Sequence, residues 1–488
     1  MRPSYLVSAI EKLFPKITVV KEKESGTAVG QITSKKNGML YFTKEMSRVR
    51  EGKASDDWME LYVTYLRDDG FRDRVQELLR AAFIRGLHGQ LTYETSKELY
   101  GEVMTNSVTR LEQFASCAFA HFAMYGLHLT ERETYGVKAA DLGVIFHRAM
   151  ELFSRQLMGR GQKWDEIDGK EKISLMEECV DTVSREYGAG ILHDNARQEY
   201  TIRRIKRILC RTIWALDEQL KAGDFQPTGF EVTFADAGDL ESVNVKLGEQ
   251  GKLRLQGRVD RIDTASEEDV IYVKIIDYKS GSTKFDPVSL YYGLQLQLVV
   301  YLNAALEMER KLHKEKEVVP AGIFYYHFDD PILEKDGDLQ EKEMQQKLLR
   351  KLRPDGILNS DEHILKMLDR NLGSDSLVIP AGMKKDGTLK AASSAVTTEQ
   401  FRQLSSFVSG KMEKMAGQIL DGVIEARPFA DKTKCACDYC AYTDVCGFDK
   451  KIPGMCPNRA ENLSKSEVWE RICREAEDNA QKTEVKLQ

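Results

Sequence analysis

Two aspartates and a lysine lie close together near the middle of the chain. Asp260 falls in the run GRVDRID, and Asp277 and Lys279 fall in the run VIYVKIIDYKSG. Carboxylate oxygens are ligands that Mg²⁺ accepts while it keeps several waters. A metal-activated water can attack a phosphodiester, and a nearby ammonium can stabilise the charge that develops on the phosphate. These residue types therefore indicate metal-dependent phosphodiester hydrolysis.

Both runs carry the alternation of apolar and polar residues that is typical of half-buried strands. The alternating apolar positions are Leu253, Leu255 and Val259 before and within the first run, and Ile271, Val273 and Ile275 in the second. The polar segment TASEED between them is typical of a turn, so the sequence predicts a hairpin. Lys279 follows Asp277 by two residues, which places both side chains on one face of the second strand.

A D-x-K triplet alone is weak evidence, because an aspartate in a hairpin is usually solvated or stabilises the turn. His147 lies one turn from Glu151 in the amphipathic helix predicted over ADLGVIFHRAMELF (140–153). It either completes the shell of the cation or is an ordinary hydrogen-bonded histidine on a helix. Glu231, in the strand predicted over TGFEVTFA (228–235), is expected to point into the same region and to support the ligands from outside.

The surrounding segments predict an α/β fold. The helix predicted over VSLYYGLQLQLVVYLNAALEM (288–308) carries Gln297 and Tyr301 one turn apart. This pair could orient a metal ligand or contact a phosphate, or the helix could simply cover a sheet. VVPAGIFYYHF (318–328) is predicted as a further strand. Helix, three strands, helix and strand in this order are typical of a sheet with helices on its faces.

Composition limits the classes of function. The chain has 488 residues, a net charge of −6 and 30% charged residues. No apolar run approaches the roughly 18 residues that span a bilayer, and the N-terminal segment lacks a secretory pattern, so we expect a soluble cytoplasmic protein. The net charge implies that nucleic acid would be held by local patches such as RRIKR (203–207), although such a run is more often a solvated helix face. The chain has no G-x-x-x-x-G-K-[ST] phosphate loop and should not hydrolyse ATP by itself.

The nine cysteines are unevenly distributed. Four fall within CACDYCAYTDVC (435–446), whereas Cys117 and four others are scattered. Clustered thiols in a cytoplasmic protein indicate a metal site rather than disulfides. Cys117 lies in a helix that Ser107 is predicted to cap. A lone cysteine on such a helix is usually a buried hydrophobe, so its role depends on the distant group.

Four motifs in fixed order carry a family resemblance. G-x-x-x-H in the helix, G-R-V-D-R-I-D, I-D-Y-K-S-G and Q-x-x-x-Y resemble the PD-(D/E)XK nuclease superfamily in its RecB-like form. SVTRLEQFASCAFAHFAMYGL, the segment from LDRNLGSDSL to TTEQF, and CDYCAYTDVCGFD resemble the C-terminal part of the AddB family, which belongs to the AddAB helicase-nucleases. The resemblance covers roughly residues 100 to 475. It implies a restriction-endonuclease-like core, with a mixed sheet flanked by helices and with helical N-terminal and insertion segments.

The resemblance also implies roles for particular residues. The implied Mg²⁺ ligands are His147, Asp260, Asp277 and the backbone carbonyl of Tyr278. Lys279 would be the catalytic cation, and Gln297 and Tyr301 match the trailing helix motif. The implied ligands of a [4Fe-4S] cluster are Cys117, Cys437, Cys440 and Cys446. Such a cluster would join distant parts of the chain and restrict the unfolded state.

The expected organisation follows the family. Residues 1–105 would be a helical remnant of a helicase-like region, 106–460 the nuclease domain, and 461–488 a charged tail that frays. A long helix is predicted over 397–424, opened by a Thr cap with Glu399 behind it. The implied function is a Mg²⁺-dependent DNA exonuclease that cuts the 5′-terminated strand at double-strand breaks, together with an AddA-type subunit. Family members are longer, so the chain is a fragment, a split gene product or an autonomous short form.

Several alternatives remain open from the residues. Cys435 makes the local pattern C-x-C-x₂-C and could replace Cys437 as a ligand. Four cysteines could hold a structural zinc instead of an iron-sulfur cluster. The chain could also be a catalytically silent DNA-binding or scaffold subunit, or a single-strand nuclease of the Cas4 type, which shares the nuclease motifs and four cysteines but is much shorter.

Overall fold

The structure is a computed structural model. The described residues are 5–17, 32–50, 52–83, 89–101, 103–132, 136–161, 164–233, 240, 242–246, 252–333, 340–452 and 454–487. The chain divides into two compact units. The smaller contains Met1–Gly86 and Lys451–Gly454, and the larger contains Leu87–Lys450 and Met455–Gln488. Among the described residues, no helix combines the length and the hydropathy needed to cross a bilayer.

The smaller unit is helical. Its helices are α1 (Tyr5–Leu13), α2 (Lys35–Arg50), α3 (Asp56–Arg67) and α4 (Arg72–Ala82). Phe42 and Trp58 stack with ring centroids 4.6 Å apart, and Trp58 Nε1 donates a hydrogen bond to the Phe42 carbonyl. The helical character predicted for this part of the chain is present in α1 to α4, within the described residues.

The larger unit is built on a six-stranded sheet with the order β2-β5-β6-β7-β8-β9. The strands are β2 (Gln226–Thr233), β5 (Arg258–Ser266), β6 (Val270–Lys279), β7 (Glu317–His327), β8 (Asp355–Asn359) and β9 (Ala395–Val396). The β6/β7 and β8/β9 pairs are parallel and the other neighbours are antiparallel. The sheet is therefore mixed, which confirms the predicted fold class.

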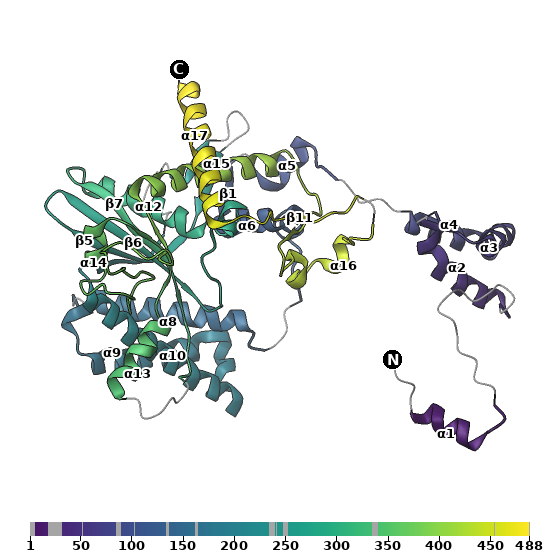
Figure 1. Ribbon diagram of the computed structural model, residues 1–488, viewed down its shortest axis with the longest axis horizontal. Coiled ribbons are helices and arrows are strands. Elements are labelled where there is room, and N and C mark those ends of the chain that lie inside the picture. Colours follow the sequence, from purple (N-terminus) through teal and green to yellow (C-terminus); the bar gives the residue numbers. More distant parts are fainter. Residues whose placement is uncertain are drawn as a thin grey trace. The chain divides into compact units, whose positions relative to one another are not determined.

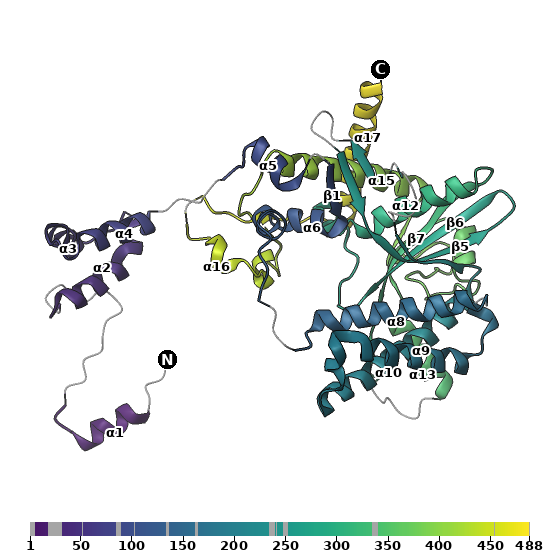
Figure 2. The ribbon, with the colours of Figure 1, turned by 180° about the vertical axis from the view of Figure 1, so that it is seen from behind.

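Helices cover both faces of this sheet (Figures 1 and 2). On one face lie α8 (Ala139–Gly159), α9 (Gly169–Glu186) and α10 (Ala196–Ala222), and on the other lie α12 (Gln297–Leu312), α15 (Thr398–Leu420) and α17 (Lys465–Leu487). Successive strand residues point to opposite faces. Val273 and Ile275 of β6 accordingly pack with α12, and Ile276 and Tyr278 pack with α8 and α10.

The remaining elements connect these layers. They are α5 (Tyr93–Tyr100), β1 (Val103–Ser107), α6 (Val108–Ser116), α7 (Ala118–His121), η2 (Phe122–Gly126), η3 (Trp164–Glu166), η4 (Tyr187–His193), β3 (Asn244–Lys246), β4 (Lys252–Gln256), α11 (Pro287–Tyr291), α13 (Glu341–Lys351), α14 (Glu362–Leu368), β10 (Phe429–Ala430), η5 (Ala436–Tyr439), α16 (Thr443–Cys446) and β11 (Asn458–Arg459). Ser107 caps α6 as predicted, because its hydroxyl accepts a hydrogen bond from the Arg110 amide.

Some boundaries differ from the predictions. The predicted hairpin is present as β5 and β6, but the run before it breaks at Gly257. β4 instead joins a separate three-stranded sheet with the order β1-β4-β3. The helix predicted over 288–308 is two helices, α11 and α12, with a break at Gly293, whose φ of +85° is a left-handed conformation that favours glycine.

One expectation about the C-terminal part is confirmed and another is wrong. α15 opens with a cap at Thr397 and carries Glu399 in its first turn, as predicted, and the side chain that completes the capping box is Gln400. The charged tail does not fray over its described length, since it forms α17. Val468 and Ile472 of α17 are fully buried in the core that also contains α15.

Candidate active site

The hairpin β5/β6 brings the two aspartates together at the point where its strands separate. The last paired residues of the ladder are Arg261 and Ile276, and Asp260 and Asp277 come next on each strand. Asp260 Oδ2 accepts a hydrogen bond from the Tyr278 amide at 2.7 Å, which replaces the missing ladder bond. Both aspartates are buried, Asp277 to 2% exposure.

His147 reaches the same place from α8. Its Nδ1 lies 3.5 Å from Asp260 Oδ2, and its ring stands edge-on to Tyr278. The helix approaches the loop after β6 closely, because a Cβ at Gly143 would lie 2.9 Å from the hydroxyl of Ser280. The G-x-x-x-H spacing therefore serves both the packing of α8 and the position of His147.

Glu231 completes a group of three ligand-type side chains. One ligand atom each of His147, Glu231 and Asp260 lies within 4.8 Å of the others. Glu231 has a φ of +50°, which is a strained backbone conformation for a residue other than glycine. It also forms an ion pair with Arg258. The sequence predicted only an outer position for Glu231, so the structure places it nearer to the ligands than expected.

Asp277 lies beside this group and contacts the lysine. Lys279 Nζ is 2.7 Å from Asp277 Oδ2 and donates a hydrogen bond of 2.7 Å to Gln297 Oε1. Gln297 Nε2 in turn donates to the Tyr301 hydroxyl at 2.7 Å. The ammonium also lies 5.3 Å from the centre of the Tyr325 ring. The lysine is thus held by the pair Gln297 and Tyr301, which the sequence singled out.

The electrostatics of the site favour a bound cation. Burial, and then the charge of Asp260, raises the pKa of Asp277 to about 7, and the same two causes raise the pKa of Glu231 to about 7. Burial lowers the pKa of His147, but the contact with Asp260 and the surrounding acids outweigh it, so that pKa is raised overall. Asp277 Oδ2 is buried and makes no hydrogen bond of good geometry, although Lys279 lies near it. A hard cation with oxygen ligands would relieve this repulsion.

The second aspartate of the G-R-V-D-R-I-D motif has a different role. Asp263 is completely buried between two cations. Arg261 contacts it through Nε at 2.5 Å and Nη2 at 2.9 Å, and Lys274 Nζ lies 2.9 Å from its Oδ2. The ion group Arg261, Asp263 and Lys274 therefore stabilises the hairpin and does not face the site. Nothing in the sequence beyond the motif itself indicated this group.

The cysteines form a second candidate site within the larger unit. Cys117 ends α6, while Cys437, Cys440 and Cys446 lie in or next to η5 and α16. Burial raises the pKa of Cys117, and the nearby thiols Cys440 and Cys446 raise it further. Burial and the neighbouring Cys435 raise the pKa of Cys437 to about 12, with additional effects from Cys117 and Cys446. The four cysteines named by the resemblance therefore lie near one another.

Four cysteines at this place could hold a metal group. Thiolate sulfurs are ligands both of structural zinc and of iron-sulfur clusters. A fifth cysteine, Cys435, lies next to Cys437. Its sulfur accepts a hydrogen bond from the Asp438 amide, and it raises the pKa of Cys437.

Comparisons with known proteins agree with this geometry. The chain is similar to proteins named as the B subunits of ATP-dependent helicase/deoxyribonucleases, with 36% identity to that of Lachnoclostridium phytofermentans and 34% to those of Alkaliphilus metalliredigens and Clostridium novyi. The alignments cover 98 to 99% of this chain but only 41 to 43% of the relatives, so the chain spans less than half of their length. These relatives confirm the resemblance carried by the motifs. The PD-(D/E)XK nuclease superfamily matches residues 105–447, and the chain belongs to that superfamily.

Proposed function

We propose that this chain is the Mg²⁺-dependent nuclease module of an AddAB-type helicase-nuclease. The observation that carries the proposal is the convergence of His147, Asp260 and Asp277 beside a lysine that Gln297 holds. Superfamily membership supports nuclease chemistry, and the name of the relatives supports DNA as the substrate. Cleavage of the 5′-terminated strand from an end, and association with an AddA-type subunit in double-strand break repair, follow from the resemblance.

The residues of the chain have separate tasks in this mechanism. Bound Mg²⁺ would supply an activated water and neutralise charge on the scissile phosphate. Its ligands would be His147, Asp260, Asp277 and the Tyr278 carbonyl, with Glu231 close enough to contribute. Lys279 donates to the phosphate oxygens as charge develops on them, and Gln297 keeps the ammonium at that position.

A basic pocket next to the site supports a nucleic acid substrate. It has a volume of about 560 Å³ and begins at Ser280, which follows Lys279. Its basic lining residues are Arg204, Lys284, Arg350, Lys351 and Arg353. Among the described residues, Arg204 and Lys284 form no ion pair, so both remain available to phosphates. We propose that one DNA strand passes through this basic pocket on its way to the site.

A [4Fe-4S] cluster is the second part of the proposal. Cys117, Cys437, Cys440 and Cys446 would hold it, because the resemblance implies these four and their thiols are near enough to affect one another's pKa values. Its ligands come from segments far apart in the sequence. The cluster would therefore restrict a very long loop in the unfolded chain and stabilise the nuclease domain.

The central test is the variant Asp277→Ala. We expect Mg²⁺-dependent cleavage of linear DNA to fall at least a hundredfold, because the variant loses a ligand and the partner of Lys279. DNA binding should persist. The matched control is Asp269→Ala, an exposed acidic residue in the turn between β5 and β6, at the other end of the hairpin from the metal group. Cleavage that survives Asp277→Ala would refute the proposed site, and a wild-type chain that binds DNA without cleaving it would identify a scaffold subunit.

A further inference from the structure

The helix α12, which carries Gln297, begins without a side-chain cap from a residue near it in the sequence. Its N-cap residue is Leu296, whose side chain cannot accept a hydrogen bond. The first amides of a helix have no partner within the helix, and they need acceptors from elsewhere.

Glu112 of α6 supplies this acceptor from a distant part of the chain. Its Oε1 accepts hydrogen bonds from the Leu296 amide at 2.7 Å and the Gln297 amide at 3.1 Å. A carboxylate at this position also interacts favourably with the positive end of the helix dipole. Glu112 thus fixes the backbone at the residue whose side chain holds the catalytic lysine.

The path from Glu112 to the reacting groups is short and continuous. The Gln297 amide donates to Glu112, Gln297 Oε1 accepts from Lys279 Nζ at 2.7 Å, and that ammonium lies 2.7 Å from Asp277 Oδ2. A shift of the first turn of α12 would move the Gln297 side chain and release the ammonium.

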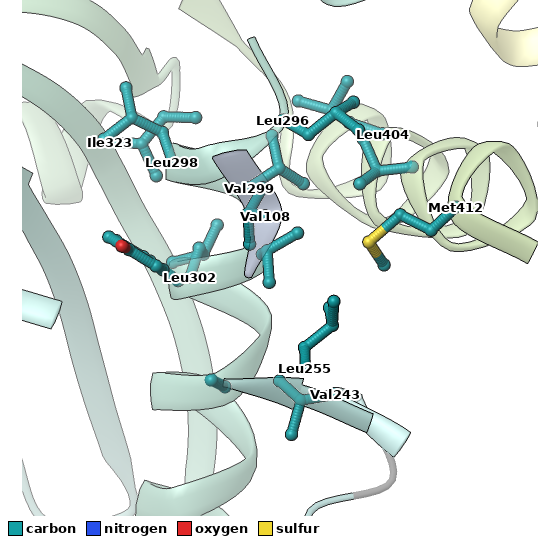
Figure 3. Close-up of a cluster of buried hydrophobic side chains, with 14 of the residues drawn as sticks. Val108, Val243, Leu255, Leu296, Leu298, Val299, Leu302, Ile323, Leu404 and Met412 are labelled. Carbon is teal, nitrogen blue, oxygen red and sulfur yellow. The ribbon is translucent and has the colours of Figure 1, made fainter. Parts of the chain in front are cut away.

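The packing around Glu112 keeps α6 in place against α12. Val108 and Leu111 of α6 belong to the same core as Val299 and Leu302 of α12, and Figure 3 shows Val108 beside Val299. Burial raises the pKa of Glu112 to about 7, against the lowering effect of its two amide donors and of Lys279. The two amide donors therefore account for the position of the Glu112 carboxyl.

We propose that Glu112 is a positioning residue that sets the first turn of α12 and thereby the place of Lys279. The proposal rests on the proposed nuclease function for its effect on catalysis. It also connects the two sites of the larger unit, because Cys117 ends the helix that carries Glu112. A displacement of α6 at the cysteines would therefore reach the lysine through this cap.

Three variants of the full chain test the catalytic part. Glu112→Ala should lower kcat by about tenfold or more with little change in KM, because the lysine is misplaced while DNA contacts remain. Glu112→Gln should keep most of kcat, since its amide oxygen can accept both hydrogen bonds. Gln113→Ala, the neighbour on α6, should behave as wild type.

A double-mutant cycle separates positioning from general damage. In a Gln297→Ala background, Glu112→Ala should cause almost no further loss of kcat, because both residues act through Lys279. Equal losses in the two backgrounds, or a Glu112→Gln variant as impaired as Glu112→Ala, would overturn the proposal.

Amide hydrogen exchange decides the structural part without any nuclease activity. Glu112→Ala should speed exchange in a peptide that covers Leu296 and Gln297, and should leave β6 unchanged. Unchanged exchange there would overturn the capping role. If the wild-type chain does not cleave DNA but exchange behaves as expected, the cap stands and the proposed function fails.

Discussion

At the scale of single residues, the site brings together acidic side chains whose negative charges repel one another. Asp277 and Glu231 are both buried close to Asp260, and each has its pKa raised to about 7 from ordinary values of 3.8 and 4.5. The folded chain without metal therefore binds protons that the unfolded chain releases between about pH 4 and 7. Stability consequently decreases as pH rises through this window and changes little above it.

This titration predicts how metal and pH act together. In EDTA, the Tm should decrease between pH 5 and pH 8, whereas Mg²⁺ should raise the Tm more at pH 8 than at pH 5, because it competes with protons for the same oxygens. Calorimetry of both forms measures the difference. Asp277→Asn should weaken both effects. A Tm that Mg²⁺ leaves unchanged at pH 8 would contradict the metal site.

The buried ion group gives a prediction about stability alone. Asp263→Ala should lower the free energy of unfolding by roughly 3–5 kcal/mol, because Arg261 and Lys274 would remain buried without an anion. Urea unfolding measures this change. Replacing all three residues with apolar ones of similar volume should recover most of the loss. A single variant that unfolds like wild type would mean that water reaches Arg261.

At the scale of elements, the periodicity of apolar residues predicted the strands and helices whose formation depends on neighbouring residues. The alternation around Asp260 and Asp277 predicted β5 and β6, and helical spacing placed His147 and the pair of Gln297 and Tyr301 correctly. The alternation of apolar and polar residues could not locate the break between β4 and β5, because it continues through Gly257. At that glycine the chain passes from the three-stranded sheet to the six-stranded sheet. The short strands β8 and β9 were missed, since their pairing depends on the edge of β7.

The residues that the sequence missed act over long distances. Nothing near Glu112 indicates that it caps a helix beginning at residue 297. The left-handed conformation of Glu231 cannot be inferred from a glutamate within an alternating run, because such a run is typical of an extended strand. The prediction that the tail frays was wrong for a related reason. Apolar residues of α17 pack in the same core as α15, and this contact cannot be inferred from the tail alone.

The segments that carry cysteines give a prediction at this scale. Cys437→Ala should remove iron and the brown chromophore from anaerobically purified protein and should lower the Tm, because one of four ligands is lost. Cys435→Ala should retain both, since the resemblance implies Cys437 rather than Cys435 as the ligand. Visible absorption with iron and zinc analysis measures the outcome. Stoichiometric zinc without iron would contradict the cluster.

At the scale of the whole molecule, the proposed binding of DNA by a chain with net charge −6 requires local concentrations of positive charge. The predicted patch RRIKR is only partly available. Lys206 is paired with Asp181 at 2.7 Å, and Arg207 is paired with Asp330. Arg204 of the same run makes no ion pair among the described residues and lines the basic pocket beside Lys279. The pocket therefore includes one arginine of the patch that has no ion pair among the described residues.

Salt dependence can count the phosphates that this pocket holds. Each neutralised phosphate of a single strand contributes about 0.7 to the slope of log Kd against log salt concentration. The double variant Arg204→Gln and Lys284→Gln should therefore reduce the slope by about 1.4, measured by fluorescence anisotropy with a labelled single strand in EDTA. The control Arg310→Gln and Lys314→Gln removes the same charge near the opposite end of β7 and should leave the slope unchanged. Equal reductions in both double variants would mean that the strand is attracted by overall charge, and the basic pocket would then not be its path.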